Sequence, residues 1–208
     1  PPVGYLEKIR EICTKHGFLL VFDEVITGFG RMGTAFATQK FNVKPDIITM
    51  AKALTNGAIP MGGVAVTDEI YNTVTDASPE DAIEFFHGYT YSAHPAACAA
   101  GIATQKIYQS EGLFERAASL EDYFLDAVWT LQDHPLVTDV RGIGLMAGVE
   151  LVSDGVAGHR GVQMQKAMFW NGLHVKFTGD NAIIAPAFVA ERKHVDEIVD
   201  KFRSSLDA

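Results

Sequence analysis

A lysine stands at the end of a short apolar segment, where its amino group could act as a nucleophile. Residues 47–51 (IITMA) are mostly apolar, and Lys52 follows them directly. Such a run is typical of a buried parallel strand. Burial of an ammonium group is costly, and desolvation favours the neutral, nucleophilic amine. The simpler alternative for a single residue is a lysine that extends past the strand end and keeps its charge in water.

A second apolar segment ends in acidic residues. Residues 18–22 (FLLVF) are followed by Asp23 and Glu24. A glycine-rich turn and a short predicted helix over residues 34–41 separate this segment from the one that ends at Lys52. The order strand, helix, strand predicts two parallel strands. Asp23 and Lys52 would then both lie at carboxyl ends of strands, where open α/β sheets bind ligands.

An acid and a lysine that converge at one sheet edge provide the chemistry that pyridoxal phosphate requires. The lysine amine forms a Schiff base with the cofactor, and the acid keeps the pyridine nitrogen protonated, so that the ring accepts electrons. We therefore predict that Lys52 binds pyridoxal phosphate and that Asp23 pairs with the ring nitrogen.

Three segments resemble the cofactor-binding motifs of class III aminotransferases. They are residues 22–31 (FDEVITGFGR), 51–57 (AKALTNG) and 87–95 (HGYTYSAHP). The resemblance is greatest to the ω-amino acid–pyruvate (β-alanine–pyruvate) transaminases, and it covers nearly the whole chain. Members of this family are much longer, so the chain resembles only their C-terminal half.

This resemblance implies a reaction and further site residues. An amino group would move from an ω-amino acid or amine to pyruvate, with Lys52 also serving as the general base. Val25 would pack on one face of the cofactor ring. Thr90 would reach the phosphate of the partner subunit's cofactor, in a homodimer or larger assembly with shared sites. Related transaminases carry an arginine for the substrate carboxylate where this chain has Lys176.

The resemblance and the pattern of elements together predict two domains. Residues 1–110 would form the later part of the large α/β domain of a fold type I pyridoxal-phosphate transferase, with a mostly parallel sheet. Residues 111–208 would form a smaller α+β C-terminal domain. An apolar stripe over residues 113–131 predicts its first helix. Strands between 137 and 152, with a break at 141–144, a helix over 162–170, a hairpin around Gly179-Asp180 and a closing amphipathic helix should follow.

The glycine-rich turn also permits a rival cofactor. Residues 28–33 (GFGRMG) match the G-x-G-x-x-G pattern of dinucleotide-binding turns. Asp23 and Glu24 would repel a pyrophosphate at this position, and Asp46 precedes the next strand, where it is badly placed for a ribose. These features count against a dinucleotide site. The glycines alone would be typical of a flexible loop, but the resemblance to class III aminotransferases implies an ordered active-site loop instead.

The amino-acid composition and the spacing of histidines and cysteines narrow the possible partners, metal sites and cellular location of the chain. The chain has a net charge of −9 and no basic cluster, so we expect no nucleic-acid partner. His87 and His94 have no carboxylate or cysteine at ligand spacing, which favours two polar histidines packed in a loop over a metal site. Cys13 and Cys98 are expected to be buried thiols in a reducing compartment. With no signal peptide and no apolar run long enough to span a membrane, the expected location is the cytoplasm.

Two other functions remain open at this point. Another class III enzyme, a decarboxylase, racemase or aminomutase, would use the same cofactor residues. A non-catalytic fragment or interaction module is the third hypothesis, because the residues that complete the phosphate site lie upstream in the family. The sequence does not identify the amino donor.

Overall fold

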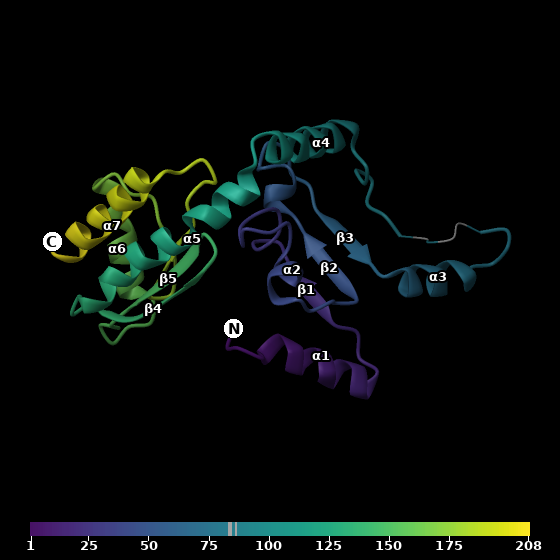
Figure 1. The fold of residues 1–208 in the computed structure, drawn as a ribbon, viewed down its shortest axis with the longest axis horizontal. Helices are drawn as coiled ribbons and strands as arrows, with labels where there is room; N and C mark the ends of the chain where they lie inside the picture. The colour runs from purple at the N-terminus through teal and green to yellow at the C-terminus, as the bar shows by residue number, and fades with distance from the viewer. Residues whose placement is uncertain (83–84, 86) are drawn as a thin grey trace. The chain divides into compact units, whose positions relative to one another are not determined.

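The computed structural model describes residues 1–82, 85 and 87–208, and the chain divides into two compact units (Figure 1). The first unit comprises Pro1–Phe29 and Thr34–Glu111. The second comprises Gly30–Gly33 and Gly112–Ala208. Residues 30–33 of the glycine-rich turn therefore belong to the second unit, although the residues on both sides of them belong to the first.

The first unit contains a three-stranded sheet in the order β1-β2-β3. Strand β1 (Val21–Asp23) pairs in parallel with β2 (Ile47–Met50), which confirms the predicted parallel strands. Strand β3 (Gly63–Val66) pairs antiparallel with β2, so the sheet is mixed. The reason is the connection between β2 and β3, which contains only the 3₁₀ turn η1 (Lys52–Leu54) and no crossover helix.

Among its described residues, the first unit also contains four α-helices. They are α1 (Tyr5–His16), α2 (Ala37–Phe41), α3 (Asp68–Asp76) and α4 (Pro95–Ser110). Gly17 ends α1 with φ 67°, a left-handed conformation that glycine adopts readily. A proline in the first turn of α4 costs no hydrogen bond there. Residues 78–84 (SPEDAIE) are polar and acidic, which predicts an exposed excursion. Residues 79–82 are exposed, and residues 83 and 84 lie outside the described part.

Two acids fix the start and the end of the parallel strands. The carboxylate of Asp46 accepts hydrogen bonds from the Leu20 amide at 2.6 Å and from Arg10 Nη1 at 2.7 Å. These two donors lower the pKa of Asp46 below its usual value, the amide contributing more than the guanidinium. Asp46 therefore ties α1 to the amino ends of β1 and β2.

Glu24 performs the corresponding role at the other end of β1. Its side chain is 1% exposed, and its two carboxylate oxygens accept hydrogen bonds from the amides of Ala37 and Thr38 and from the Thr27 hydroxyl. Glu24 thus satisfies the first amides of α2, which explains why this helix begins at Ala37 rather than at the predicted Thr34.

The second unit contains an antiparallel sheet in the order β4-β5-β7-β6 and three α-helices. The strands are β4 (Val137–Ile143), β5 (Met146–Leu151), β6 (Lys176–Thr178) and β7 (Asn181–Ile184). The helices are α5 (Leu113–Trp129), followed by the 3₁₀ turn η2 (Thr130–Asp133), α6 (His159–Trp170) and α7 (Arg192–Leu206). The predicted hairpin about Gly179-Asp180 and the closing helix are confirmed.

The core of the second unit forms where α5 packs against α7 and β4. Phe124, from the predicted apolar stripe in α5, and Phe202, from the closing amphipathic helix α7, are fully buried there. The break predicted at residues 141–144 is wrong in position, because β4 continues through Ile143. Gly142 lies inside that strand, where a Cβ atom would come within 2.5 Å of Leu125 Cδ2. This glycine permits close packing rather than a turn.

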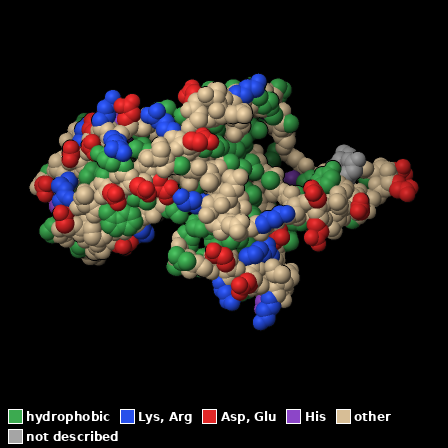
Figure 2. Space-filling model, viewed as in Figure 1, with side chains coloured by type: hydrophobic (Ala, Val, Ile, Leu, Met, Phe, Trp, Pro, Cys, Tyr) green, Lys and Arg blue, Asp and Glu red, His purple; other side chains and the backbone are tan. Residues whose placement is uncertain are grey.

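Three further features concern the predicted partners and location: the surface charge, the helix lengths and the cysteines. Figure 2 shows lysine and arginine side chains interspersed with acids on the visible face, without a continuous basic surface there. No helix of the described residues is long and apolar enough to cross a bilayer. Cys13 and Cys98 are free thiols that are half-buried, not buried as predicted.

Candidate active site

The predicted acid and lysine lie at the same edge of the first unit's sheet. Asp23 is the last residue of β1, and the parallel register places it opposite Thr49. Lys52 follows two positions after the end of β2. Both side chains are exposed in this chain. The structure therefore brings Asp23 and Lys52 to the carboxyl ends of two neighbouring parallel strands.

The carboxylate of Asp23 is held in place through one of its oxygens. Oδ1 accepts a hydrogen bond from the Val25 amide at 3.1 Å and is 3.5 Å from the Thr49 hydroxyl that donates to it. Oδ2 has no hydrogen bond to any described residue, so it can bind another group. Sequence reasoning missed Thr49, whose position opposite Asp23 depends on the strand register.

Lys52 has a strained backbone. Its φ angle is 44°, in the left-handed region that residues other than glycine rarely adopt. Such a conformation costs about 1–3 kcal/mol and persists where surrounding contacts enforce it. The Lys52 carbonyl accepts hydrogen bonds from the amides of Thr55 and Gly57, at 3.3 and 3.2 Å.

Of the two possibilities that the sequence left for Lys52, burial or extension into water, the structure shows an exposed residue. Strand β2 ends at Met50, and the 3₁₀ turn η1 then carries Lys52 to an exposed position. Its amino group forms no ion pair with any described residue. The amine is therefore accessible and has no ion-pair partner among the described residues. A group that forms a covalent bond with a ligand must be accessible in this way.

Helix α4 anchors the lysine loop, by which we mean residues 51–57. The Tyr108 hydroxyl donates a hydrogen bond to the Ala53 carbonyl at 2.8 Å, and Gln105 Nε2 donates to the Leu54 carbonyl at 3.3 Å. Thr55, which is 2% exposed, closes the loop by donating its hydroxyl to the Ile59 carbonyl at 2.6 Å. Sequence reasoning missed these contacts. Their signal in the sequence was weak: polar residues spaced along a helix of mostly small residues.

The turn after β1 does not form a dinucleotide site. Val25, half-buried, begins this turn, but no helix starts within residues 28–33. The next helix begins at Ala37, and Glu24 already occupies its first amides. Asp46, the candidate for the ribose, binds Arg10 and Leu20 instead. The dinucleotide hypothesis is therefore wrong.

Two glycines of this turn provide close packing within the second unit. A Cβ atom on Gly30 would lie 2.4 Å from the ring of Phe114, and one on Gly33 would lie 2.8 Å from Ala118 Cβ. Both glycines also have positive φ angles. The turn is thus ordered by contacts with α5, in agreement with the expectation of an ordered loop.

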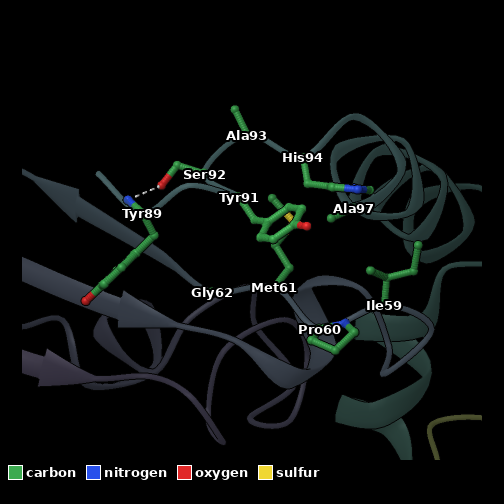
Figure 3. A pocket seen from close by; sticks show the side chains of 10 residues that line it. All are labelled: Ile59, Pro60, Met61, Gly62, Tyr89, Tyr91, Ser92, Ala93, His94 and Ala97. Atoms are coloured by element: carbon green, nitrogen blue, oxygen red, sulfur yellow. Dashed lines mark hydrogen bonds between the residues drawn. The ribbon is translucent and has the colours of Figure 1, made fainter. Parts of the chain in front are cut away.

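Thr90 lies in an exposed turn. Its neighbours in the sequence, Tyr89 and Tyr91, line a hollow of about 430 Å³ (Figure 3). The Tyr89 amide donates to the Ser92 hydroxyl at 2.9 Å, which closes the turn around Thr90. Figure 3 shows the Tyr89 side chain extending away from Tyr91. The hollow itself is lined by Ile59, Pro60, Met61, Gly62, Tyr89, Tyr91, Ser92, Ala93, His94 and Ala97.

His87 and His94 are exposed, which differs from the prediction that they pack in the loop. The His87 ring lies between those of Phe85 and Tyr89, with centroid distances of 5.5 and 5.7 Å. Across the described residues, no group of three or more histidine, cysteine or acidic side chains could hold a metal ion.

Lys176 belongs to the second unit. It is the first residue of β6, where it pairs with Ile183 of β7, and its side chain is exposed. It forms no ion pair with the described residues. Its ammonium group is therefore available to an anionic ligand, while the other predicted site residues all belong to the first unit.

Comparison with known proteins identifies the family. The family model described as aminotransferase class-III matches residues 1–206. The chain belongs to the class III aminotransferases. This confirms the family that the three sequence motifs indicated.

Curated relatives of this class III chain are about twice as long. It is 49% identical to an omega-aminotransferase of Caulobacter vibrioides over 207 residues, which cover 99% of the chain and 47% of the relative. It is 43% identical to a beta-alanine–pyruvate aminotransferase of Pseudomonas aeruginosa, with 100% of the chain and 47% of the relative covered. The chain thus spans about half the length of these relatives.

Solved structures confirm the predicted fold class. An (S)-enantioselective omega-transaminase from Thermomicrobium roseum superposes with a TM-score of 0.91 at 40% identity. An omega transaminase from Pseudomonas jessenii, solved in complex with PMP, superposes with a TM-score of 0.92 at 32% identity. Each comparison covers 100% of this chain and 47% of the other. The chain therefore has the fold of a part of these transaminases.

The adjacent acids Asp23 and Glu24 should differ in their effect on stability. Glu24→Gln should lower the free energy of unfolding by about 1–3 kcal/mol, because an amide group cannot accept all the hydrogen bonds that the buried carboxylate accepts. Asp23→Asn should change it by less than about 0.5 kcal/mol, as is usual for exposed positions. Urea unfolding of both variants in the full-length protein measures this difference. An equal loss in both would show that Asp23 is a structural residue.

Proposed function

We propose that this chain is part of an aminotransferase that uses pyridoxal phosphate to move an amino group from an ω-amino acid or amine to pyruvate. The observation that carries this proposal is the position of Asp23 and Lys52 at the carboxyl ends of the parallel strands β1 and β2. The names of the relatives, omega-aminotransferase and beta-alanine–pyruvate aminotransferase, support the donor class and the acceptor.

The chemistry of the available groups fits this cofactor. When bound, pyridoxal phosphate supplies an aldehyde carbon and an electron-accepting pyridinium ring. The exposed Lys52 amine can bond to the aldehyde carbon. The unoccupied Oδ2 atom of Asp23 can accept a hydrogen bond from a protonated ring nitrogen, while Thr49 and Val25 hold Oδ1.

Each residue of the site then has a defined task. Lys52 Nζ attaches the cofactor, and after release it moves a proton from the carbon that bears the donor's amino group. Asp23 keeps the proton on the ring nitrogen, because a carboxylate beside the nitrogen stabilises its positive charge. Val25 packs against one face of the ring. The donor leaves as a carbonyl compound, and pyruvate leaves as alanine.

We assign Thr90 to the cofactor phosphate of a partner subunit, to which its hydroxyl would donate a hydrogen bond. The exposure of Thr90 and the closed turn around it support this assignment. The active protein would then be a homodimer or a larger assembly with shared sites. A cytoplasmic location stays a prediction from the sequence.

We also propose a domain assignment. The first unit, with its α/β elements and the acid and lysine, would be the later part of the large cofactor-binding domain. The second unit, with its antiparallel sheet, would be the smaller C-terminal domain. The unit boundary between Glu111 and Gly112 lies close to the boundary expected after residue 110.

The reaction can be tested on the full-length enzyme with β-alanine as donor and pyruvate as acceptor. Alanine should form, and Lys52→Ala should lower turnover by about 10²–10⁴-fold, the range expected for loss of a general base. Asp23→Asn should retain bound cofactor but turn over more slowly, whereas Lys44→Ala serves as an exposed control and should match the parent.

Three outcomes would contradict the proposal. Full activity of Lys52→Ala would exclude the catalytic role of this lysine. Release of carbon dioxide or racemisation of an amino acid without alanine formation would instead favour another class III reaction. Absence of bound cofactor in the full-length protein would favour a non-catalytic role.

Lys176 provides a separate test of substrate recognition. If its ammonium pairs with the substrate carboxylate, Lys176→Met should raise the Michaelis constant for pyruvate about tenfold, because charge-assisted hydrogen bonds contribute about 1.5–3 kcal/mol. Lys176→Arg should keep or lower this constant, since a guanidinium binds a carboxylate through two hydrogen bonds. Unchanged constants in both variants would leave Lys176 as a surface residue.

A further inference from the structure

The lysine loop is held by a side chain that is distant in sequence. Tyr108, on α4, is 5% exposed, and its hydroxyl lies 2.8 Å from the carbonyl oxygen of Ala53. Ala53 is the residue directly after Lys52. Tyr108 is thus a buried side chain whose hydroxyl contacts the backbone one residue after the lysine.

The backbone at this point requires support. Lys52 has φ 44°, and Ala51 before it has φ −162° and ψ −149°, so the chain changes direction sharply at the end of β2. A non-glycine residue keeps a left-handed conformation only where neighbouring contacts enforce it. The carbonyls of Ala53 and Leu54, which follow Lys52, are the groups that α4 holds.

We propose that Tyr108 is a positioning residue for Lys52, which acts through the Ala53 carbonyl to keep the amino group at a fixed place. This inference rests on the proposed function of Lys52. Gln105 adds a second contact to the loop, but it is half-buried and its hydrogen bond is longer, at 3.3 Å. Tyr108 therefore contributes the greater part of the constraint.

The geometry explains why the hydroxyl, not the ring alone, is needed. The buried ring fills space beside the loop, and phenylalanine would fill it equally well. Only the hydroxyl satisfies the Ala53 carbonyl, and without it the loop can relax toward an ordinary backbone conformation. A small displacement of a reacting group is enough to reduce catalysis strongly.

The test compares Tyr108→Phe with Thr104→Val in the full-length enzyme. Thr104 is a suitable control because it lies on the same helix, is also buried, and donates its hydroxyl to the Ala100 carbonyl of its own helix, not to the lysine loop. Each variant removes one buried hydroxyl from α4 and keeps the shape of the side chain.

Two measurements distinguish positioning from stability. Tyr108→Phe should lower kcat about fivefold, the effect of one neutral hydrogen bond, and change the Michaelis constant for pyruvate less than twofold. In the apoenzyme, competitive labelling with acetic anhydride should show a changed reactivity of Lys52 relative to the exposed Lys106, by twofold or more. Thr104→Val should leave both quantities unchanged, whatever its effect on the melting temperature.

The inference is overturned if Tyr108→Phe keeps the parent kcat and the parent reactivity of Lys52, or if Thr104→Val changes both equally. Its failure can be separated from failure of the proposed function. If Lys52→Ala abolishes turnover but Tyr108→Phe has no effect, only the positioning role is wrong. If Lys52→Ala keeps its activity, the proposed function itself is wrong.

Discussion

The parallel pairing of β1 with β2 determines where this chain can perform chemistry. The register sets Asp23 opposite Thr49, and Lys52 follows shortly after the end of the second strand. Without this pairing, an acid and a lysine 29 positions apart (52 − 23) in the sequence would have no reason to lie at one edge. Asp46 stabilises the pairing from the opposite end, through Arg10 and the Leu20 amide.

Two adjacent acids at the end of β1 have separate tasks because strand geometry directs neighbouring side chains to opposite faces. Glu24 is buried and fully committed to Thr27 and the first turn of α2. Asp23 is exposed, and its Oδ2 atom has no hydrogen bond to any described residue. Under the proposed function, Glu24 would serve stability and Asp23 would serve ligand binding, so that either residue could be altered without the other.

Sequence reasoning identified the residues whose signal is local. Lys52 and Asp23 follow apolar runs, the hairpin about Gly179-Asp180 has a turn sequence, and the apolar stripe of α5 repeats at helical spacing. Each of these features depends on neighbours within a few positions. The family was recognisable for the same reason, because its motifs are short and contiguous.

The remaining features depend on contacts between distant segments. The hydrogen bond from Tyr108 to Ala53 joins residues 55 positions apart, and the polar residues spaced along α4 do not indicate which segment they contact. The antiparallel direction of β3 follows from a connection that holds only a 3₁₀ turn. The apolar residues before Lys52 left open whether it is buried or extends into water, and the structure decides for exposure because β2 ends at Met50.

The central claim is that Lys52 carries the cofactor, and covalent capture tests it most directly. The full-length enzyme loaded with pyridoxal phosphate would be reduced with borohydride, digested and sequenced by mass spectrometry. The account predicts a pyridoxyl group on Lys52, in the peptide that contains residues 47–57. A modification found on Lys40 or Lys176 instead, with Lys52 unmodified, would contradict it.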